Sequence, residues 1–413
     1  MRNSLSWERN VLSNGLTVLL YPRSSRMMAQ LSVAIEYGSN DDSEENAGTA
    51  HFLEHMLVGG SKNRIRLHNE IERLGGWSNF ETSDEFTFST VNIFPSQIAK
   101  ASKVLSGLLF DSAFAKEKFE LERKAIMNEI AEAHDDPRDR VAEILTKCLF
   151  KDHPIKNPVL GSKKTINQLT LNEIEKAHQN YYVPQRMVLI LTGNFTNKDA
   201  ETVLQDFQDR KSHNSAPKRN TQTEEKEPKR ETIIKKSGIA QAYFSFGLRT
   251  TLAKDTDTPS LDTIEALLGM GESSRLFVQL REKRALTYDF EALNVAGLDY
   301  GYFSINCPVN VRALNQTKRI ILDELQKLKA RPIAKNELDK SKNLMLGSIL
   351  RQLDNSQELP RLLAYDEIHF ESENALVDYT NKISSVSEQD IIKTANKYFQ
   401  DKNYATVILI PKK

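Results

Sequence analysis

The sequence has little cysteine, no long apolar run and no excess of charge of either sign. Cys148 and Cys307 are the only cysteines among 413 residues and form no C-x-x-C pair. This excludes a disulfide-framework protein and a thiolate zinc site, and favours two buried free thiols. No stretch reaches the roughly 18 consecutive apolar residues of a membrane-spanning helix, so we expect no membrane partner.

The charges of the chain balance. Lysine plus arginine and aspartate plus glutamate both number 56, so the formal net charge is zero. A balanced chain has no global field that attracts nucleic acid, and we expect no nucleic-acid partner. The first ten residues lack the apolar segment of a signal peptide, and Glu8 argues against an import presequence. We therefore expect a cytoplasmic protein.

The length of the chain predicts two domains. Apolar residues make up 39% and charged residues 27% of the sequence, which is typical of a soluble globular protein. Residues 212–231 are polar, contain two prolines and lack large apolar side chains, so we interpret them as a linker. The predicted domains are residues 1–211 and residues 232–413.

Both predicted domains end in a helical pattern followed by a strand-like run. Tyr182 and Val188 of the first correspond to Phe399 and Ala405 of the second at one offset, since 399 − 182 and 405 − 188 are both 217. This indicates an internal duplication. The predicted fold class is α+β, with two homologous domains that each contain a mainly antiparallel β-sheet packed with helices. The long segments that we expect to be helical are 48–59, 95–110, 116–134, 259–267, 311–330 and 335–353.

The segment from Ala47 to Val58 predicts a metal-binding helix. His51 and His55 are four residues apart, so on a helix their imidazoles leave the same face, as two ligands of one tetrahedral zinc require. Glu54 lies beside them, placed to reach a metal-bound water without being a ligand. Two of the eight histidines can also adopt this spacing by chance, so the prediction needs a third ligand.

The predicted helix 116–134 offers candidates for that ligand. Glu122 and Glu129 lie on one side of this helix together with Ile126 and Ala133. In chain order the four residues are spaced i, i+4, i+7 and i+11. Acids beside apolar neighbours are costly unless they are paired or bound to a metal. The spacing alone makes Glu122 and Glu129 equally good candidates.

The sequences HFLEH at 51–55 and ERKAIMNE at 122–129 together resemble the pitrilysin family of zinc metallopeptidases, also called the insulinase or mitochondrial-processing-peptidase family, in its short two-domain form. The resemblance implies that His51, His55 and Glu129 bind one Zn2+ per chain. It implies that Glu54 is the catalytic base and that Glu122 supports the site. Residues 1–211 are then the catalytic domain, and residues 232–413 contact substrate without a metal motif.

Residues 75–82 resemble the edge strand of this family against which substrates pair. Phe80 and Glu81 replace the alanine and aromatic residue common in relatives, which predicts a narrower or more acidic groove. The resemblance predicts these substrate-binding residues: Asn79, Phe80, Glu81 and Thr82.

Residues 274–288 resemble the family segment whose arginine and tyrosine reach the substrate, here Arg281 and Tyr288. Without the resemblance, surface packing at the end of a helix is the simpler interpretation of these two residues. With it, Tyr288 donates a hydrogen bond to the oxyanion and Arg281 binds the substrate. The family also implies a homodimer or a heterodimer with a related chain.

The predicted function is therefore a zinc-dependent endopeptidase that hydrolyses extended peptides or unfolded protein segments, with a zinc-activated water and Glu54 as general base. One alternative is a non-catalytic peptide-binding or assembly subunit of a related heterodimeric peptidase. Such subunits typically lose a ligand or the base, and this chain retains them. A second alternative is a zinc hydrolase with a non-peptide substrate, which needs neither the edge strand nor Arg281 and Tyr288.

Overall fold

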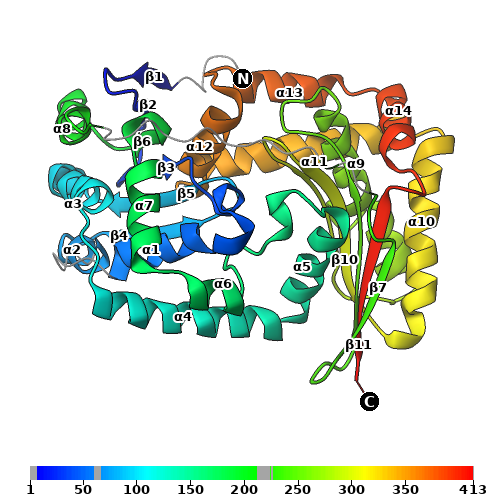
Figure 1. The fold of residues 1–413 in the computed structure, drawn as a ribbon. Helices are drawn as coiled ribbons and strands as arrows, with labels where there is room; N and C mark the ends of the chain where they lie inside the picture. Colours follow the sequence, from blue (N-terminus) through cyan, green and yellow to red (C-terminus); the bar gives the residue numbers. More distant parts are fainter. Residues whose placement is uncertain (1–6, 60–66, 212–223, 225–226, 413) are drawn as a thin grey trace. The chain divides into compact units, whose positions relative to one another are not determined.

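The structure, a computed structural model, describes residues 7–59, 67–211, 224 and 227–412 (Figure 1). It divides into two compact units. The first unit comprises residues 1–131, 157–220 and 352–375, and the second comprises residues 132–156, 221–351 and 376–413. Most of the predicted linker lies outside the described residues, and its last residue, Glu231, begins a strand. Each unit is described by itself below.

The first unit is built on a six-stranded sheet in the order β1-β2-β6-β3-β5-β4. Only β2 and β6 are parallel neighbours, and the other pairs are antiparallel. Strand β4 pairs with β5 alone, so it is an edge of the sheet. The strands are β1 (Glu8–Val11), β2 (Thr17–Pro22), β3 (Ala29–Ile35), β4 (Trp77–Thr82), β5 (Thr87–Ile93) and β6 (Met187–Gly193).

Helices pack against the apolar face of this sheet. Alternate residues of β3, among them Leu31, Val33 and Ile35, join one buried core with Phe52 of α1. Helices α1 and α3 contact this sheet directly. The helices of the first unit, with α4 ending in the second, are α1 (Thr49–Gly59), α2 (Leu67–Arg73), α3 (Ile98–Phe110), α4 (Lys116–Asp135), α6 (Lys163–Gln168), α7 (Leu171–Tyr181), α8 (Asn197–Gln208) and α12 (Glu358–Phe370).

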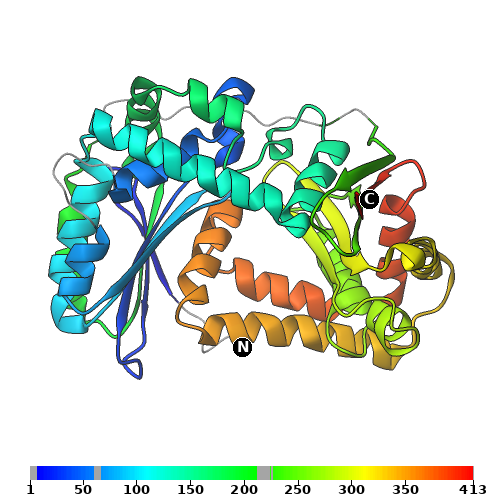
Figure 2. The same ribbon diagram turned by 90° about the horizontal axis from the view of Figure 1, so that it is seen from below.

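The other face of the first sheet carries both polar residues, such as Gln30 and Thr192, and apolar ones, such as Val188 and Ile190, and α12 packs on it. Gln30 and Thr192 line a pocket on this face together with Leu359 of α12. The Nε2 atom of His369 in α12 lies 2.8 Å from Oε2 of Glu85, and both side chains are buried. Figure 2 shows α12, in orange, beside this sheet. The first unit therefore includes a helix from the second half of the sequence.

The second unit contains a five-stranded sheet in the order β7-β11-β8-β10-β9. Only β7 and β11 are parallel. This order repeats that of the first sheet without β1, and its edge strand β9 corresponds to β4. The prediction of two homologous α+β domains with mainly antiparallel sheets is confirmed. The strands are β7 (Glu231–Lys236), β8 (Ala242–Arg249), β9 (Glu291–Ala296), β10 (Gly301–Val309) and β11 (Tyr404–Pro411).

The second unit contains a helix from the first half of the sequence, α5. Its Leu145 and Leu149 pack against Gly247 of β8. A Cβ atom added to this glycine would lie 2.8 Å from the Leu145 side chain and 3.1 Å from that of Leu149. Helix α5 contacts β8 and β11, just as α12 contacts the corresponding strands β3 and β6. The exchanged segments begin at 132 and 352, an offset of 220 close to that of the duplication. The helices are α5 (Pro137–Leu149), α9 (Thr258–Gly269), α10 (Leu314–Ala330), α11 (Lys335–Asp354), α13 (Ala375–Ser385) and α14 (Glu388–Tyr398).

The predictions for the two cysteines and for the long helical segments are confirmed by this fold. Cys148 and Cys307 are free thiols, and both are buried. Each of the six long helical segments coincides with a helix, within a few residues at its ends. Within the described part of the chain, no helix has the length and apolarity needed to cross a bilayer. The cytoplasmic location stays a prediction.

Candidate metal centre

Helix α1, which carries His51, Glu54 and His55, is fixed at its N-terminal end by a buried carboxylate. Oδ2 of Asp42 accepts hydrogen bonds from the backbone N–H groups of Gly48 and Ala50, at 3.0 and 3.2 Å. Its Oδ1 accepts a hydrogen bond of 2.8 Å from the hydroxyl of Tyr37. The first N–H groups of a helix have no partner within it, and a negative charge there is favourable. Asp42 therefore fixes the start of the helix that carries the motif.

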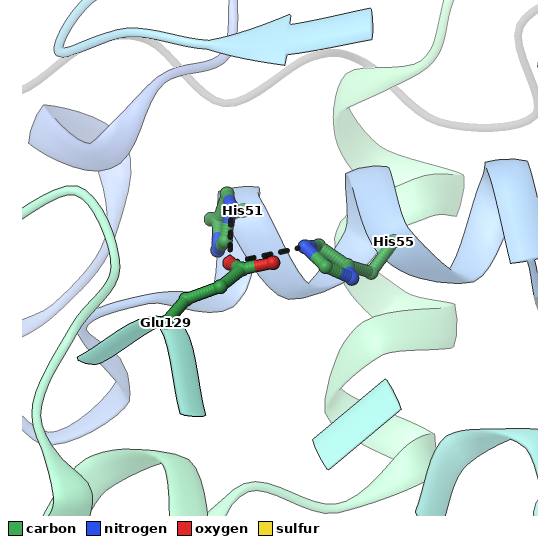
Figure 3. A group of neighbouring side chains, drawn as sticks. All are labelled: His51, His55 and Glu129. Atoms are coloured by element: carbon green, nitrogen blue, oxygen red, sulfur yellow. Dashed lines mark ion pairs between the residues drawn. The ribbon is translucent and has the colours of Figure 1, made fainter. Parts of the chain in front are cut away.

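His51 and His55 of α1 and Glu129 of α4 converge on one point (Figure 3). Oε2 of Glu129 lies 3.6 Å from Nε2 of His51 and 3.4 Å from Nε2 of His55. Three ligand atoms, one from each side chain, all lie within 4.8 Å of one another. The structure thus brings together the two motif histidines and the acid selected by the family resemblance.

These three side chains fit a zinc ion. Ligand atoms at about 2.0–2.2 Å from a tetrahedral zinc lie about 3.3–3.6 Å apart, and both nitrogen–oxygen distances fall in that range. Two imidazoles and one carboxylate leave a fourth position for water, as in catalytic zinc sites. Burial, followed by the neighbouring His55, lowers the pKa of His51 to about 3. His51 is therefore a neutral imidazole, the form that binds a metal.

Glu122 contacts His55 from the side away from Glu129. Its Oε2 lies 3.1 Å from Nδ1 of His55, while Nε2 of the same ring faces Glu129. Burial by itself lowers the pKa of His55, but the hydrogen bond with Glu122 and the nearby carboxylates outweigh it, so that the pKa is raised. A carboxylate on the second nitrogen of a ligating histidine fixes the ring and its tautomer. This placement matches the supporting role predicted for Glu122.

Glu54 lies beside the ligands and is held by the edge strand. The hydroxyl of Thr82 in β4 donates a hydrogen bond of 2.6 Å to Oε2 of Glu54. Burial is the largest influence on the Glu54 carboxyl and raises its pKa, as does the charge of Glu129, whereas the hydrogen bonds from Thr82 and the charge of His55 lower it. The net effect is a raised pKa. A carboxyl group with a raised pKa is a better proton acceptor than an ordinary surface glutamate.

The side chains of Phe80 and Glu81, two other predicted substrate residues on β4, contact different parts of the first unit. Phe80 is buried and belongs to the core of the first unit, so its side chain does not narrow a groove. Glu81 forms an ion pair with Arg361 of α12, so its charge is balanced. The expectation of a narrower or more acidic groove is therefore wrong for both side chains. Their backbone groups lie on an edge strand, as predicted.

Arg281 and Tyr288 lie together in the second unit. The Arg281 guanidinium carbon is 4.4 Å from the centre of the Tyr288 ring and 4.9 Å from that of Phe277. Arg281 and Tyr288 line a cavity of about 730 Å³. The Tyr288 side chain is largely exposed. Their action on substrate at the metal cluster stays a prediction.

Three supporting features of the site were not predicted from the sequence. Asp42 follows no recognisable capping pattern, because six residues separate it from Gly48. The contact of Thr82 with Glu54 requires the fold, since 28 residues separate them. For Gly59 the sequence offered only a weak indication, namely a glycine within the helix that carries the motif. A Cβ atom at Gly59 would meet Oε1 of Glu122, so a larger residue there requires that carboxylate to move.

Comparisons with known proteins agree with this geometry. The family model described as "Insulinase (Peptidase family M16)" matches residues 17–163, and that described as "Peptidase M16 inactive domain" matches residues 168–345. The three predicted ligands and Glu54 fall within the first match.

Similar sequences and structures extend over nearly the whole chain. An uncharacterized zinc protease of Streptomyces coelicolor is 26% identical over 93% of this chain and 85% of its own length. Another, from Bacillus subtilis, is 25% identical over 98% of both chains. The crystal structure of a protease from Helicobacter pylori matches with a TM-score of 0.90 and 26% identity, covering 98% of this chain and all of that one. A chain of Complex III2 from Candida albicans, 14% identical, shares the fold with a TM-score of 0.82 over 97% of this chain and 95% of its own.

Replacing Asp42 by alanine should destabilise the first unit by about 3 kcal/mol, because each buried donor left without an acceptor costs about 1–3 kcal/mol. Urea unfolding followed by tryptophan fluorescence measures this, since the two tryptophans, Trp7 and Trp77, both belong to the first unit. Tyr37→Phe removes one donor and keeps the stacking on Tyr181, so it should cost only about 1 kcal/mol. Equal losses in the two variants would contradict the role of Asp42.

Replacing Gly59 by alanine should weaken zinc binding about 10–100-fold, because the new methyl group displaces Glu122 from His55. Glu122→Gln should have a similar effect. Competition with a fluorescent zinc chelator measures both affinities. Gly107→Ala in α3 is the matched control, since a Cβ there meets nothing within 4 Å, and it should bind zinc like the wild type. Unchanged affinity in Gly59→Ala would refute this role of the glycine.

Proposed function

The chain belongs to peptidase family M16, and on this basis we propose that it is a zinc-dependent endopeptidase that hydrolyses extended peptides or unfolded protein segments. The observation that carries the proposal is the cluster of His51, His55 and Glu129, with Glu54 beside it and an open edge strand next to Glu54. Proteins similar over nearly the whole chain are named zinc proteases, which supports the same reaction class.

His51, His55 and Glu129 would hold one zinc ion per chain. When bound, zinc lowers the pKa of a water molecule and polarises the carbonyl of the peptide bond. Glu122 holds the His55 ring in a fixed orientation through Nδ1. The burial of His51 and the partial burial of His55 exclude bulk water from one side of the cluster.

Glu54 is the proposed general base. Its carboxylate accepts a proton from the attacking water and passes it to the amine that leaves. Its raised pKa suits this role, because a base whose pKa lies closer to the working pH both accepts and returns a proton readily. The hydrogen bond from Thr82 directs one carboxylate oxygen toward the strand and leaves the other oxygen for water.

The substrate would bind as an added strand along β4. The backbone N–H of Ser83 donates to the carbonyl of Phe86, so the pair of Thr82 and Thr87 beside it is a non-hydrogen-bonded pair, and the backbone groups of Thr82 point away from β5. Because backbone groups alternate in direction along a strand, the N–H and C=O groups of Phe80 and Ser78 also face the open edge. Main-chain hydrogen bonds at this edge would bind extended peptides of many sequences. A substrate in this position would pass close to Glu54.

Arg281 and Tyr288 would complete the site. Tyr288 would donate a hydrogen bond to the oxyanion that forms at the peptide carbonyl, and Arg281 would bind the substrate backbone or a carboxylate. The stacked pair lines a cavity of about 730 Å³ in the second unit. We further propose a homodimer or a heterodimer with a related chain. The pair could then act within its own chain or on that of its partner.

Replacing Glu54 by glutamine should abolish peptide cleavage and leave zinc binding intact, because glutamine keeps the shape of the side chain but accepts no proton. Hydrolysis of a mixed peptide library, read by mass spectrometry, measures the activity. Glu117→Gln on α4, at an ordinary exposed acid, is the control and should cleave like the wild type. If Glu54→Gln and the wild type give the same products, or the wild type gives none, the peptidase proposal fails, and a non-catalytic binding or assembly subunit takes its place.

Replacing both His51 and His55 by alanine should remove zinc from the purified protein, because one carboxylate alone does not hold the ion. Metal analysis by inductively coupled plasma mass spectrometry measures the zinc content per chain, expected to be one in the wild type and close to zero in the variant. His134→Ala, at a half-exposed histidine at the end of α4, should retain the metal. An unchanged zinc content in the double variant would refute the assigned ligands.

A further inference from the structure

We propose that Thr82 is a positioning residue that orients the general base Glu54 through its side-chain hydroxyl. This inference rests on the proposed peptidase function. The hydroxyl donates a hydrogen bond of 2.6 Å to Oε2 of Glu54. A residue of the edge strand thus supplies a donor to the one acid of the motif that is not a proposed metal ligand.

The strand that carries Thr82 is itself fixed. Thr82 pairs with Thr87 of β5, which pairs with Ile35 of β3, which pairs with Met187 of β6. The hydroxyl of Thr87 donates to the backbone carbonyl of Tyr37, which is buried. Thr82 is therefore the last residue of a four-strand ladder, and its position does not depend on the conformation of the Glu54 side chain.

The duplicated unit provides an internal comparison. Its corresponding ladder runs from Asn294 through Phe303 and Leu248 to Tyr404. Met187 and Tyr404 are related by the offset of the duplication, since 404 − 187 is 217, so Asn294 occupies the position of Thr82. Asn294 also contacts a glutamate on the helix, because its backbone N–H donates a hydrogen bond of 2.7 Å to Oε2 of Glu265 in α9.

Glu265 is thus the counterpart of Glu54, at an offset of 265 − 54 = 211. At the same offset His51 corresponds to Asp262 and His55 to Ala266, so the metal-binding histidines have no equivalent. The Asn294 side chain donates to Oδ1 of Asp262, at 2.7 Å, and not to Glu265. The edge-strand residue therefore bonds the helix glutamate through its backbone N–H in the second unit and through its side-chain hydroxyl in the first, beside the proposed metal ligands.

In both units a hydrogen bond joins the helix to the edge strand. The bond in the first unit comes from a side-chain hydroxyl, so it can be removed without changing the backbone. This hydroxyl fixes the rotation of the Glu54 carboxylate, whose three side-chain torsions otherwise let it turn away from the cluster. Groups that orient a reacting side chain typically change the rate by one to two orders of magnitude when they are removed.

The test is a comparison of Thr82→Val with Thr82→Ser. Valine has the shape of threonine without its hydroxyl, and serine keeps the hydroxyl without the methyl group. We expect Thr82→Val to lower kcat for a peptide substrate about tenfold or more at an unchanged KM, with the zinc content of the wild type. Thr82→Ser should keep kcat within about twofold. Thr202→Val, at a half-buried threonine of α8 whose hydroxyl bonds within its own helix, should match the wild type.

Crystal structures of the metal-free wild type and of both variants provide a readout that does not depend on activity. The Glu54 carboxylate should remain at residue 82 in the wild type and in Thr82→Ser, and should leave or become disordered in Thr82→Val. An unchanged kcat in Thr82→Val, or an equal loss in both variants, would overturn the proposal. If the wild type cleaves no peptide, the proposed function fails, and the crystal structures still decide whether the hydroxyl holds Glu54.

Discussion

The burial of polar side chains at the junction of α1, α4 and β4 is the constraint on which the first unit depends. Removing imidazoles and carboxylates from water is costly unless each finds a partner. The described contacts meet this requirement for most of the cluster: Glu129 lies between the two histidines, Glu122 contacts His55, and Thr82 contacts Glu54. The exception is Nδ1 of His51, which is buried without a hydrogen-bond partner. An arrangement of this kind requires three elements in fixed positions.

The fixed positions come from the sheet and from the anchoring of α1. Asp42 determines where α1 begins, and the strand ladder determines where Thr82 lies. Gly59 leaves room for the Glu122 carboxylate beside α1, since a Cβ atom there would meet Oε1 of Glu122. The chemical site therefore depends on residues that have no chemical role of their own. This dependence also explains why we expect substitutions outside the motif to affect metal binding.

The sequence predicted the elements that have a strong local pattern. The i, i+4 spacing of His51 and His55 and the stripe containing Glu129 depend only on helical periodicity, and the repeated sheet follows from the offset of 217. Periodicity left Glu122 and Glu129 equivalent, because the distinction depends on which carboxylate approaches Nε2 of the histidines. The sequence did not show that the Phe80 side chain joins the core, because a strand turns alternate residues to opposite faces and the resemblance carried no register.

The exchange of α5 and α12 between the two units lies beyond any local pattern. Each helix packs on the sheet of the other half of the sequence, and the segments that are exchanged correspond under the duplication. A duplicated chain can exchange equivalent helices at little cost, because each sheet presents a similar surface to either copy. Once exchanged, each unit needs both halves of the sequence to complete its core. The Arg361–Glu81 ion pair is one result of this exchange, because a helix from the second half of the sequence contacts the edge strand β4 of the first sheet. Divergence of the second half can therefore alter the surroundings of this edge without changing His51, His55 or Glu129.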